Sequence, residues 1–152
     1  MVTTGATTTV DEQLVALGTI TGRVTTADGL PAAGVSVYAT NQFTSQFTAT
    51  DSNGVHVIPV FPGSYQIEFV RGAGSLAEWA HQQRFQFNAA SFAVASGGTT
   101  VVDEQLLPTG TVAGRLVDSN GQPVQFGMVQ LVGAGGLFGS ASINNGTWQT
   151  EV

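Results

Sequence analysis

The sequence contains no lysine and few charged side chains of any kind. Charged residues make up 9% of its 152 residues, and the four basic ones are all arginines, against ten acidic residues. The net charge of −6 gives no basic surface on which nucleic acid or an anionic membrane could collect. We therefore expect no nucleic-acid partner and no membrane insertion.

Cysteine is also absent, which excludes disulfides and thiolate chemistry, so stability has to come from packing. No apolar run approaches the roughly 20 residues of a membrane helix, and no signal peptide follows Met1. If the parent protein is exported, we expect its signal to lie outside this sequence. The hydrophobic content of 42%, with abundant glycine, is typical of an all-β protein rather than a disordered one.

The pentapeptide VDEQL occurs twice, at residues 10–14 and 102–106. The same offset of 92 residues aligns GTITGRV at 18–24 with GTVAGRL at 110–116, and it aligns His56 with Trp148. The register slips by one residue only around GVSVY and GMVQL, and then recovers. Self-similarity at one period is the signature of a tandem array of one structural unit.

This register divides the chain into three parts. Residues 2–17 are predicted to be the C-terminal strand of a preceding repeat, and residues 18–109 a complete repeat. Residues 110–152 are predicted to be the N-terminal part of a following repeat. The two partial copies are complementary pieces of one design.

Apolar and polar residues alternate with a period of two, which is the pattern of strands with one buried face. Tyr65, Ile67 and Phe69 share one face, for example, and Asp-Gly, Asn-Gly and Pro-Gly pairs mark the turns. The pattern predicts a seven-stranded antiparallel Greek-key β-sandwich. The expected strands cover residues 18–24, 34–40, 41–50, 55–60, 64–70, 84–94 and 99–107.

Two segments depart from the strand pattern. GSLAEWAHQQ at 74–83 is compatible with a single helical turn. VGAGGLFGSAS at 132–142 is rich in glycine but lacks the Gly-Lys-Ser/Thr signal of a phosphate-binding loop. We expect a mobile loop there; the alternative is a close backbone approach by another chain.

The order of the motifs resembles a known family. GTITGRVTTADGLPAAGVSVYA, TATDSNGVHVIPVFPGSYQIEF, AEWAHQQ and VASGGTTVVDEQL together resemble the carboxypeptidase regulatory-like domain. That domain is a prealbumin-like (transthyretin-like) β-sandwich, found in tandem on exported bacterial proteins. The resemblance implies a non-catalytic spacer, stalk or adhesion module and an extracellular or cell-surface location. Related surface sandwiches carry lysine-dependent isopeptide bonds, which a chain without lysine cannot form.

No arrangement of residues predicts catalysis. His56 and His81 are the only imidazoles, and their spacing matches no metal motif. The resemblance implies that His56 replaces an aromatic ring on a sheet face. No Gly-x-Ser-x-Gly motif is present, and the two DSNG segments at 51–54 and 118–121 are expected to be hairpin turns. The sequence therefore predicts that this chain is not an enzyme.

Acidic pairs near the junctions are the candidate metal ligands. Asp11 and Glu12 precede the complete repeat, and Asp103 and Glu104 close it. Carboxylate oxygens suit calcium, although a full calcium loop is missing. We expect no cofactor other than calcium bound weakly at these acids.

An exposed aromatic residue can stack on a sugar ring, and Trp79, beside Glu78, is the candidate glycan contact. The family resemblance instead favours Trp79 as a packing plug. If Trp79, Tyr38 and Tyr65 are exposed together, the alternative function is an accessory carbohydrate-binding module of a secreted hydrolase.

The incomplete copies predict exchange of strands between chains. Each partial copy leaves backbone N–H and C=O groups unpaired, and a strand from a neighbouring molecule can satisfy such an edge. The candidate interface residues are Val10, Leu14, Val102 and Leu106. The sequence thus favours a stalk, adhesion or fibre subunit whose partners are neighbouring repeats or identical chains, polymerising head to tail.

Overall fold

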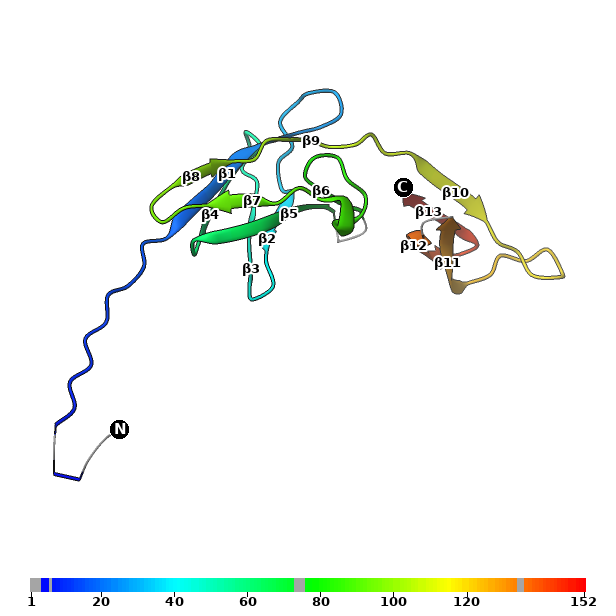
Figure 1. Cartoon of the computed structure of the whole chain (residues 1–152). Coiled ribbons are helices and arrows are strands. Elements are labelled where there is room, and N and C mark those ends of the chain that lie inside the picture. Colours follow the sequence, from blue (N-terminus) through cyan, green and yellow to red (C-terminus); the bar gives the residue numbers. More distant parts are fainter. Residues whose placement is uncertain (1–3, 6, 73–75, 134–135) are drawn as a thin grey trace.

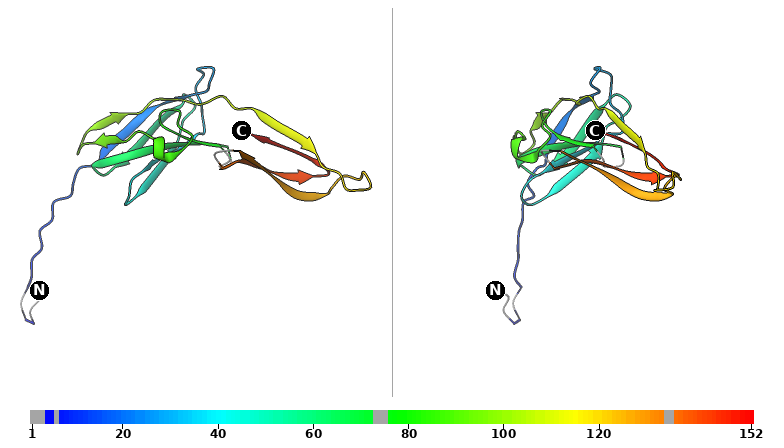
Figure 2. Two further views of the ribbon diagram at one scale, coloured as in Figure 1. Left: turned by 45° about the vertical axis from the view of Figure 1, so that its right-hand side comes forward. Right: turned by 90° about the vertical axis from the view of Figure 1, so that its right-hand side faces the viewer.

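The computed structural model describes residues 4–5, 7–72, 76–133 and 136–152 (Figure 1). The large lobe contains β1 to β9 and a short 3-10 turn, η1 (Gln86–Asn88), and the C-terminal sheet contains β10 to β13. An extended N-terminal segment leaves the large lobe on the side away from the C-terminal sheet (Figures 1 and 2). The strands are β1 (Gly18–Thr25), β2 (Ser36–Thr40), β3 (Ser45–Ala49), β4 (Val55–Val60), β5 (Gly63–Arg71), β6 (Leu76–Trp79), β7 (Phe92–Val94), β8 (Thr99–Val101), β9 (Glu104–Gln105), β10 (Thr111–Arg115), β11 (Phe126–Gly133), β12 (Gly136–Asn144) and β13 (Thr147–Glu151).

The first sheet of the large lobe is built around β1. On one edge β1 pairs antiparallel with β4, so that Gly22 lies opposite His56. On its other edge β1 pairs in parallel with β8 and then with β9. The last two strands of the lobe therefore occupy one strand position beside β1, interrupted at residues 102–103.

The second sheet has the order β3-β2-β5-β6, and β7 pairs with the beginning of β5. The chain crosses between the two sheets after β1, after β3, after β4 and after β7. These crossings bring together strands that are far apart in sequence, and the two sheets enclose one core.

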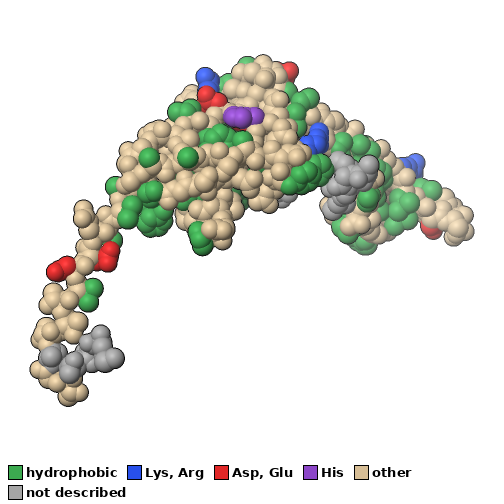
Figure 3. Space-filling model, viewed as in Figure 1, with side chains coloured by type: hydrophobic (Ala, Val, Ile, Leu, Met, Phe, Trp, Pro, Cys, Tyr) green, Lys and Arg blue, Asp and Glu red, His purple; other side chains and the backbone are tan. Residues whose placement is uncertain are grey.

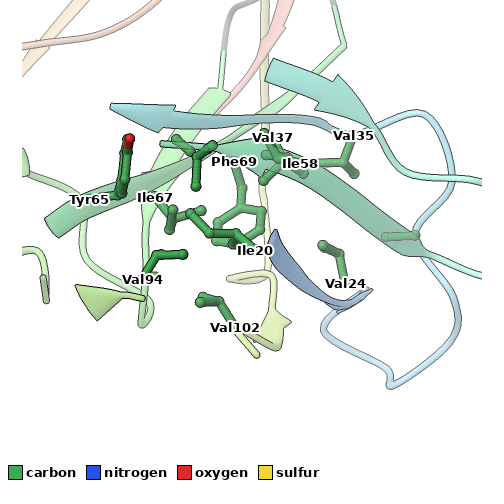
Figure 4. Packing of buried hydrophobic residues seen from close by; sticks show 14 of the residues in the cluster. Ile20, Val24, Val35, Val37, Ile58, Tyr65, Ile67, Phe69, Val94 and Val102 are labelled. Carbon is green, nitrogen blue, oxygen red and sulfur yellow. The ribbon is translucent and has the colours of Figure 1, made fainter. Parts of the chain in front are cut away.

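The core consists of the inward-facing residues of the alternating strands (Figure 4). Ile20 and Val24 of β1 are fully buried, as are Ile67 and Phe69 of β5. Tyr65 is buried too, and its hydroxyl donates a hydrogen bond to the Phe61 carbonyl at 2.9 Å. The buried set also contains Ala32, Val35, Val37, Ala39, Ile58, Val60, Ala80, Val94, Val102 and Leu106.

The predicted all-β sandwich fold is confirmed, with three differences in detail. The pairing of β1 with β8 and β9 is parallel, because both run in the direction of β1 after the chain returns from the second sheet. The two sheets contain four and five strands within the described residues, because the expected strand at 99–107 is divided into β8 and β9 and because β6 is an additional strand. Of the expected strand at 84–94, only Phe92–Val94 is extended in a sheet.

The two segments that departed from the strand pattern also differ from expectation. Residues 73–75 lie outside the described residues, but Leu76–Trp79 form strand β6 against β5 rather than a helical turn. The glycine-rich segment forms most of the β11–β12 hairpin, so the mobile-loop prediction is wrong for its described part; residues 134–135 lie outside the described residues. Backbone pairing with β11 outweighs the low strand propensity of glycine here.

The C-terminal sheet has the order β10-β13-β12-β11, and every pairing in it is antiparallel. In the large lobe, the corresponding pairs β1–β4 and β2–β3 belong to opposite sheets. In the C-terminal sheet, β12 and β13 instead meet at Asn144 and Thr147, which joins the two pairs into one surface.

Candidate functional site

The strand position beside β1 is where the second VDEQL segment is bound. The Val102 N–H donates to the Thr21 carbonyl at 2.7 Å, and the Leu106 N–H donates to the Thr25 carbonyl at 2.8 Å. The side chains of Val102 and Leu106 enter the core and are 0% and 3% exposed. Backbone hydrogen bonds and the burial of apolar side chains thus both hold this segment beside β1.

Close approach at this position depends on Gly22. A Cβ placed on Gly22 would lie 1.9 Å from the Val102 carbonyl oxygen and 2.8 Å from His56 Nε2. His56 Nε2 forms a hydrogen bond of 3.0 Å with that same carbonyl, across the space that a side chain at position 22 would fill. Burial lowers the pKa of His56. A neutral ring with its proton on Nε2 therefore suits this contact, because the carbonyl can only accept.

Two buried carboxylates hold the end of the same segment. Glu104 Oε1 accepts from the Gln82 N–H at 3.0 Å, and Glu104 Oε2 lies 3.7 Å from Nδ1 of the exposed His81. Glu78 accepts from Arg71 Nη2 at 3.0 Å and from the Leu107 N–H. Burial, offset in part by the Gln82 N–H, raises the pKa of Glu104 to about 7, and burial also raises the pKa of Glu78.

The C-terminal sheet contains matching contacts at an offset of 92 residues. The Val24 N–H donates to the Gly54 carbonyl at 2.7 Å, and the Leu116 N–H donates to the Gly146 carbonyl at 2.8 Å. Gly54 and Gly146 have φ values of 77° and 78°. These positions share their pairing and their left-handed glycine, so the two segments have the same local geometry.

Gly114 and Trp148 occupy the places that Gly22 and His56 occupy in the large lobe. Gly114 lies opposite Trp148 in the β10–β13 pair. A Cβ on Gly114 would lie 2.6 to 2.9 Å from the indole ring, so the ring covers the glycine. No hydrogen bond of the indole N–H is found within the described residues, and the ring is half-buried.

The outer edge of β10 is unpaired in the part of the chain that the structure describes. Its only strand partner there is β13, whereas β1 is paired on both edges. Val112 and Leu116 are 37% and 41% exposed, although their counterparts Ile20 and Val24 are fully buried. The C-terminal sheet therefore exposes apolar side chains beside an available backbone edge, which is the combination that accepts an added strand.

The first VDEQL segment is extended and belongs to none of the described sheets. Val10 and Leu14 are 81% and 89% exposed, in contrast to Val102 and Leu106. Among the described residues, the hydrogen bonds that join the N-terminal part to the large lobe lie beyond this segment: the Gly97 N–H donates to the Leu17 carbonyl at 3.2 Å, and the Ser96 hydroxyl donates to the Ala16 carbonyl at 3.1 Å. Figure 3 shows it standing clear of the body of the molecule, with apolar and acidic side chains exposed.

The junction acids are not gathered into one site. Asp11 and Glu12 are exposed on the N-terminal segment. Asp103 accepts from the Arg23 N–H at 2.8 Å, and Glu104 is buried beside His81. Among the described residues, no group of three or more His, Cys, Asp or Glu side chains is arranged to hold a metal ion.

The aromatic residues considered for glycan binding are not exposed together. Tyr65 is 1% exposed, Tyr38 stacks on Phe47 at 5.5 Å between ring centroids, and Trp79 is half-buried in β6. A flat sugar-binding surface of Trp79, Tyr38 and Tyr65 is therefore excluded. The DSNG segment at 51–54 is a turn, because Asp51 Oδ1 accepts from the N–H groups of Asn53 and Val55.

Sequence reasoning did not identify the glycines that admit the neighbouring segment. The available signal was a glycine present in both copies, at positions 22 and 114, in the middle of a predicted strand. Such a glycine marks a close backbone approach. No helix among the described residues is long and apolar enough to cross a membrane.

Comparison with solved structures finds distant likenesses. The chain is similar to the Bacillus anthracis TIE protein at 12% identity and a TM-score of 0.46, over 90% of this chain and 26% of that one. It is similar to the Streptococcal ancillary pilin at 16% identity and a TM-score of 0.37, over 89% of this chain and 50% of that one. The chain thus spans half or less of either protein. No curated protein matches it.

The family comparison is more direct. The model of the carboxypeptidase regulatory-like domain matches residues 19–106, nearly the whole of the large lobe. This match covers more than half of the 152 residues, so the chain belongs to the carboxypeptidase regulatory-like domain family.

Proposed function

We propose that this chain is a non-catalytic structural subunit of an exported, cell-surface fibre or stalk, which joins identical chains by strand complementation. In this proposal residues 18–109 are a complete repeat. Residues 2–17 correspond to the last strand of a repeat, and residues 110–152 correspond to the first strands of a repeat. Residues 2–17 of one molecule fill the position beside β10 of the next.

One observation carries the proposal: identical VDEQL segments are in opposite states. The segment at 102–106 is paired and buried beside β1, and the segment at 10–14 is extended and exposed. The edge of β10, which corresponds to the paired edge of β1, has no partner among the described residues. The exposed segment and the open edge therefore match in sequence register as well as in chemistry.

The contacts of the large lobe give the register of the proposed joint. The Val10 N–H would donate to the Ala113 carbonyl, as Val102 does to Thr21. The Leu14 N–H would donate to the Val117 carbonyl, as Leu106 does to Thr25.

In the same register, the Trp148 side chain would also contact the incoming segment. His56 Nε2 bonds the Val102 carbonyl across Gly22, and Trp148 covers Gly114 at the matching place. The indole N–H is a donor only, so it is suited to the Val10 carbonyl of an incoming segment.

The geometry favours assembly between molecules. The N-terminal segment and β10 lie on opposite sides of the large lobe (Figures 1 and 2), so the segment points away from the edge of its own chain. Because the two joining parts lie on opposite sides of the large lobe, we expect this head-to-tail contact to extend from chain to chain into a linear fibre. The added segment would leave the edge of β11 unpaired, so the joint is weaker than an intact sandwich and assembly should depend on concentration.

Replacing Val10 and Leu14 together by aspartate should abolish assembly. The double variant puts two carboxylates where Val102 and Leu106 are buried in the large lobe, and an unpaired charge is strongly disfavoured there. Sedimentation velocity over a range of concentrations should show growing particles for the wild-type chain and a constant monomer for the variant.

The matched control replaces two other exposed apolar residues, Leu30 and Phe61, by aspartate. They are 64% and 63% exposed and lie outside the proposed joint, while the change in charge is the same. This control should assemble like the wild type. A wild-type chain that stays monomeric at every concentration, or a V10D/L14D variant that still assembles, contradicts the proposal.

Assembly should also change the fluorescence of Trp148. In a Trp79→Phe background Trp148 is the only tryptophan, and an incoming segment would cover its half-exposed ring. We expect the emission maximum to move to shorter wavelength as concentration rises. The same measurement on W79F combined with V10D/L14D should show no movement, and a shift there would argue against this register.

A further inference from the structure

A polar pocket of about 590 Å³ lies on the large lobe, away from the edge of β10. Its walls come from the β2–β3 turn, the β4–β5 turn and the segment around η1. The volume is within the range of small-molecule sites, roughly 300–1,000 Å³. Three separate parts of the chain thus converge on one hollow.

The lining of this pocket carries hydroxyl and amide groups and an aromatic ring, with no charged side chain among its described residues. The groups that matter here are Asn41, Phe43, Ser64, Gln66, Gln86 and Ser91. Amides and hydroxyls both donate and accept hydrogen bonds, as sugar hydroxyls require. An uncharged lining provides no counter-ion for a phosphate or a carboxylate, so the chemistry favours a neutral polyhydroxylated ligand.

The polar groups on one wall are held in place before any ligand arrives. Gln66 Nε2 donates to the Gln86 carbonyl at 3.1 Å, and Gln86 Nε2 donates back to Gln66 Oε1 at 3.2 Å. The hydroxyls of Ser64 and Ser91 are 2.7 Å apart and hydrogen-bonded. A network fixed in this way loses little conformational entropy on binding.

The β2–β3 turn contributes Phe43 to the lining. Asn41 Oδ1 accepts from the N–H groups of Phe43 and Thr44, at 2.8 and 2.9 Å, which fixes the turn that carries the ring. The Phe43 side chain is 84% exposed, so its face is available to a ligand. The Nδ2 group of Asn41 remains as a donor beside it.

We propose that this pocket binds a neutral saccharide, with Phe43 stacking on a sugar ring and the amides of Asn41 and Gln86 bonding its hydroxyls. Gln66 takes part through its Oε1 alone, because its Nε2 already donates to the Gln86 and Ala89 carbonyls. The site differs from the Trp79 surface expected from sequence, and it does not require strand complementation. A surface subunit with such a pocket would attach to a neutral glycan while it assembles through its ends.

The test is a titration of the isotope-labelled V10D/L14D chain with three neutral hexasaccharides, maltohexaose, cellohexaose and xylohexaose, followed by amide NMR shifts. At least one sugar should give saturable shifts confined to residues 40–43, 62–66 and 86–91. Phe43→Ala should weaken binding about tenfold, because stacking on the ring is lost. Phe47→Ala is the control, since Phe47 is 70% exposed but stacks on Tyr38 outside the pocket.

The proposal is overturned if none of the three sugars shifts these amides, if the shifts centre on Trp79, or if F43A binds as tightly as F47A. These outcomes are independent of assembly, because the titrated chain carries the substitutions that should keep it monomeric. If the pocket binds none of these sugars, the strand-complementation proposal is unaffected, because the sedimentation experiment tests it separately.

Discussion

Substituting Gly22 by alanine should destabilise the large lobe by about 3 kcal/mol or more, at the upper end of overpacking effects. The new Cβ would lie 1.9 Å from the Val102 oxygen and 2.5 Å from its carbonyl carbon. Both are backbone atoms, so no rotation of a side chain relieves the clash. The neighbouring segment must move away from β1, and the burial of Val102 and Leu106 goes with it.

Urea unfolding, with native-state hydrogen exchange, measures this effect. The midpoint should fall, and the amide protons of Val102 and Leu106, which bond the carbonyls of Thr21 and Thr25, should exchange faster. Gly110→Ala is the matched control, since a Cβ there meets nothing within 4 Å. An unchanged midpoint for G22A would mean that the close approach does not limit packing.

Glutamine at position 104 should stabilise the chain above neutral pH and alter its pH dependence. The pKa of Glu104 is raised to about 7 by burial, from an ordinary value near 4.5. Between these two values the folded state holds a proton that the unfolded state releases, so the wild-type chain loses stability as pH rises through this window. The loss attributable to Glu104 approaches roughly 3 kcal/mol above pH 7.

The glutamine variant has no carboxylate to ionise, and its amide oxygen can still accept from the Gln82 N–H. The difference in unfolding free energy between E104Q and wild type should therefore grow from pH 4.5 to 7 and then level off. The two chains are compared by difference because His56 also contributes to the pH dependence of both. Its pKa is lowered, so its contribution to stability is lost as pH falls below about 6.5, which is the opposite direction to that of Glu104. The nearby Glu78, Arg71 and His81 are common to both chains.

Glu12→Gln makes the same change in the other VDEQL segment, where the side chain is exposed. Its pH profile should overlay that of the wild type. A difference between E104Q and wild type that stays constant from pH 4.5 to 7 would show that Glu104 does not titrate in this window.

Much of the large lobe could be predicted because its strands have one buried face. Burial follows the alternation at Ile20 and Val24, and again at Tyr65, Ile67 and Phe69. Prediction was poorest at short segments held by partners distant in sequence. Leu76–Trp79 lacks an alternating pattern of useful length, and only pairing with β5 makes it a strand. Glutamate is usually found on the surface, so the sequence does not predict that Glu104 is buried. In the folded chain β6 lies beside it, and its carboxylate accepts from the Gln82 N–H.

The sequence by itself determined the all-β class, the turns and the match between the two VDEQL segments, because these depend on local periodicity and on identity. Tertiary structure alone decided which of the two segments is buried, that β8 and β9 run parallel to β1, and that polar groups from three turns surround one pocket. Those features arise when the two sheets close on each other. Packing then brings residues together across about 80 positions of chain, as it does Arg23 and Asp103, a distance that no local pattern can encode.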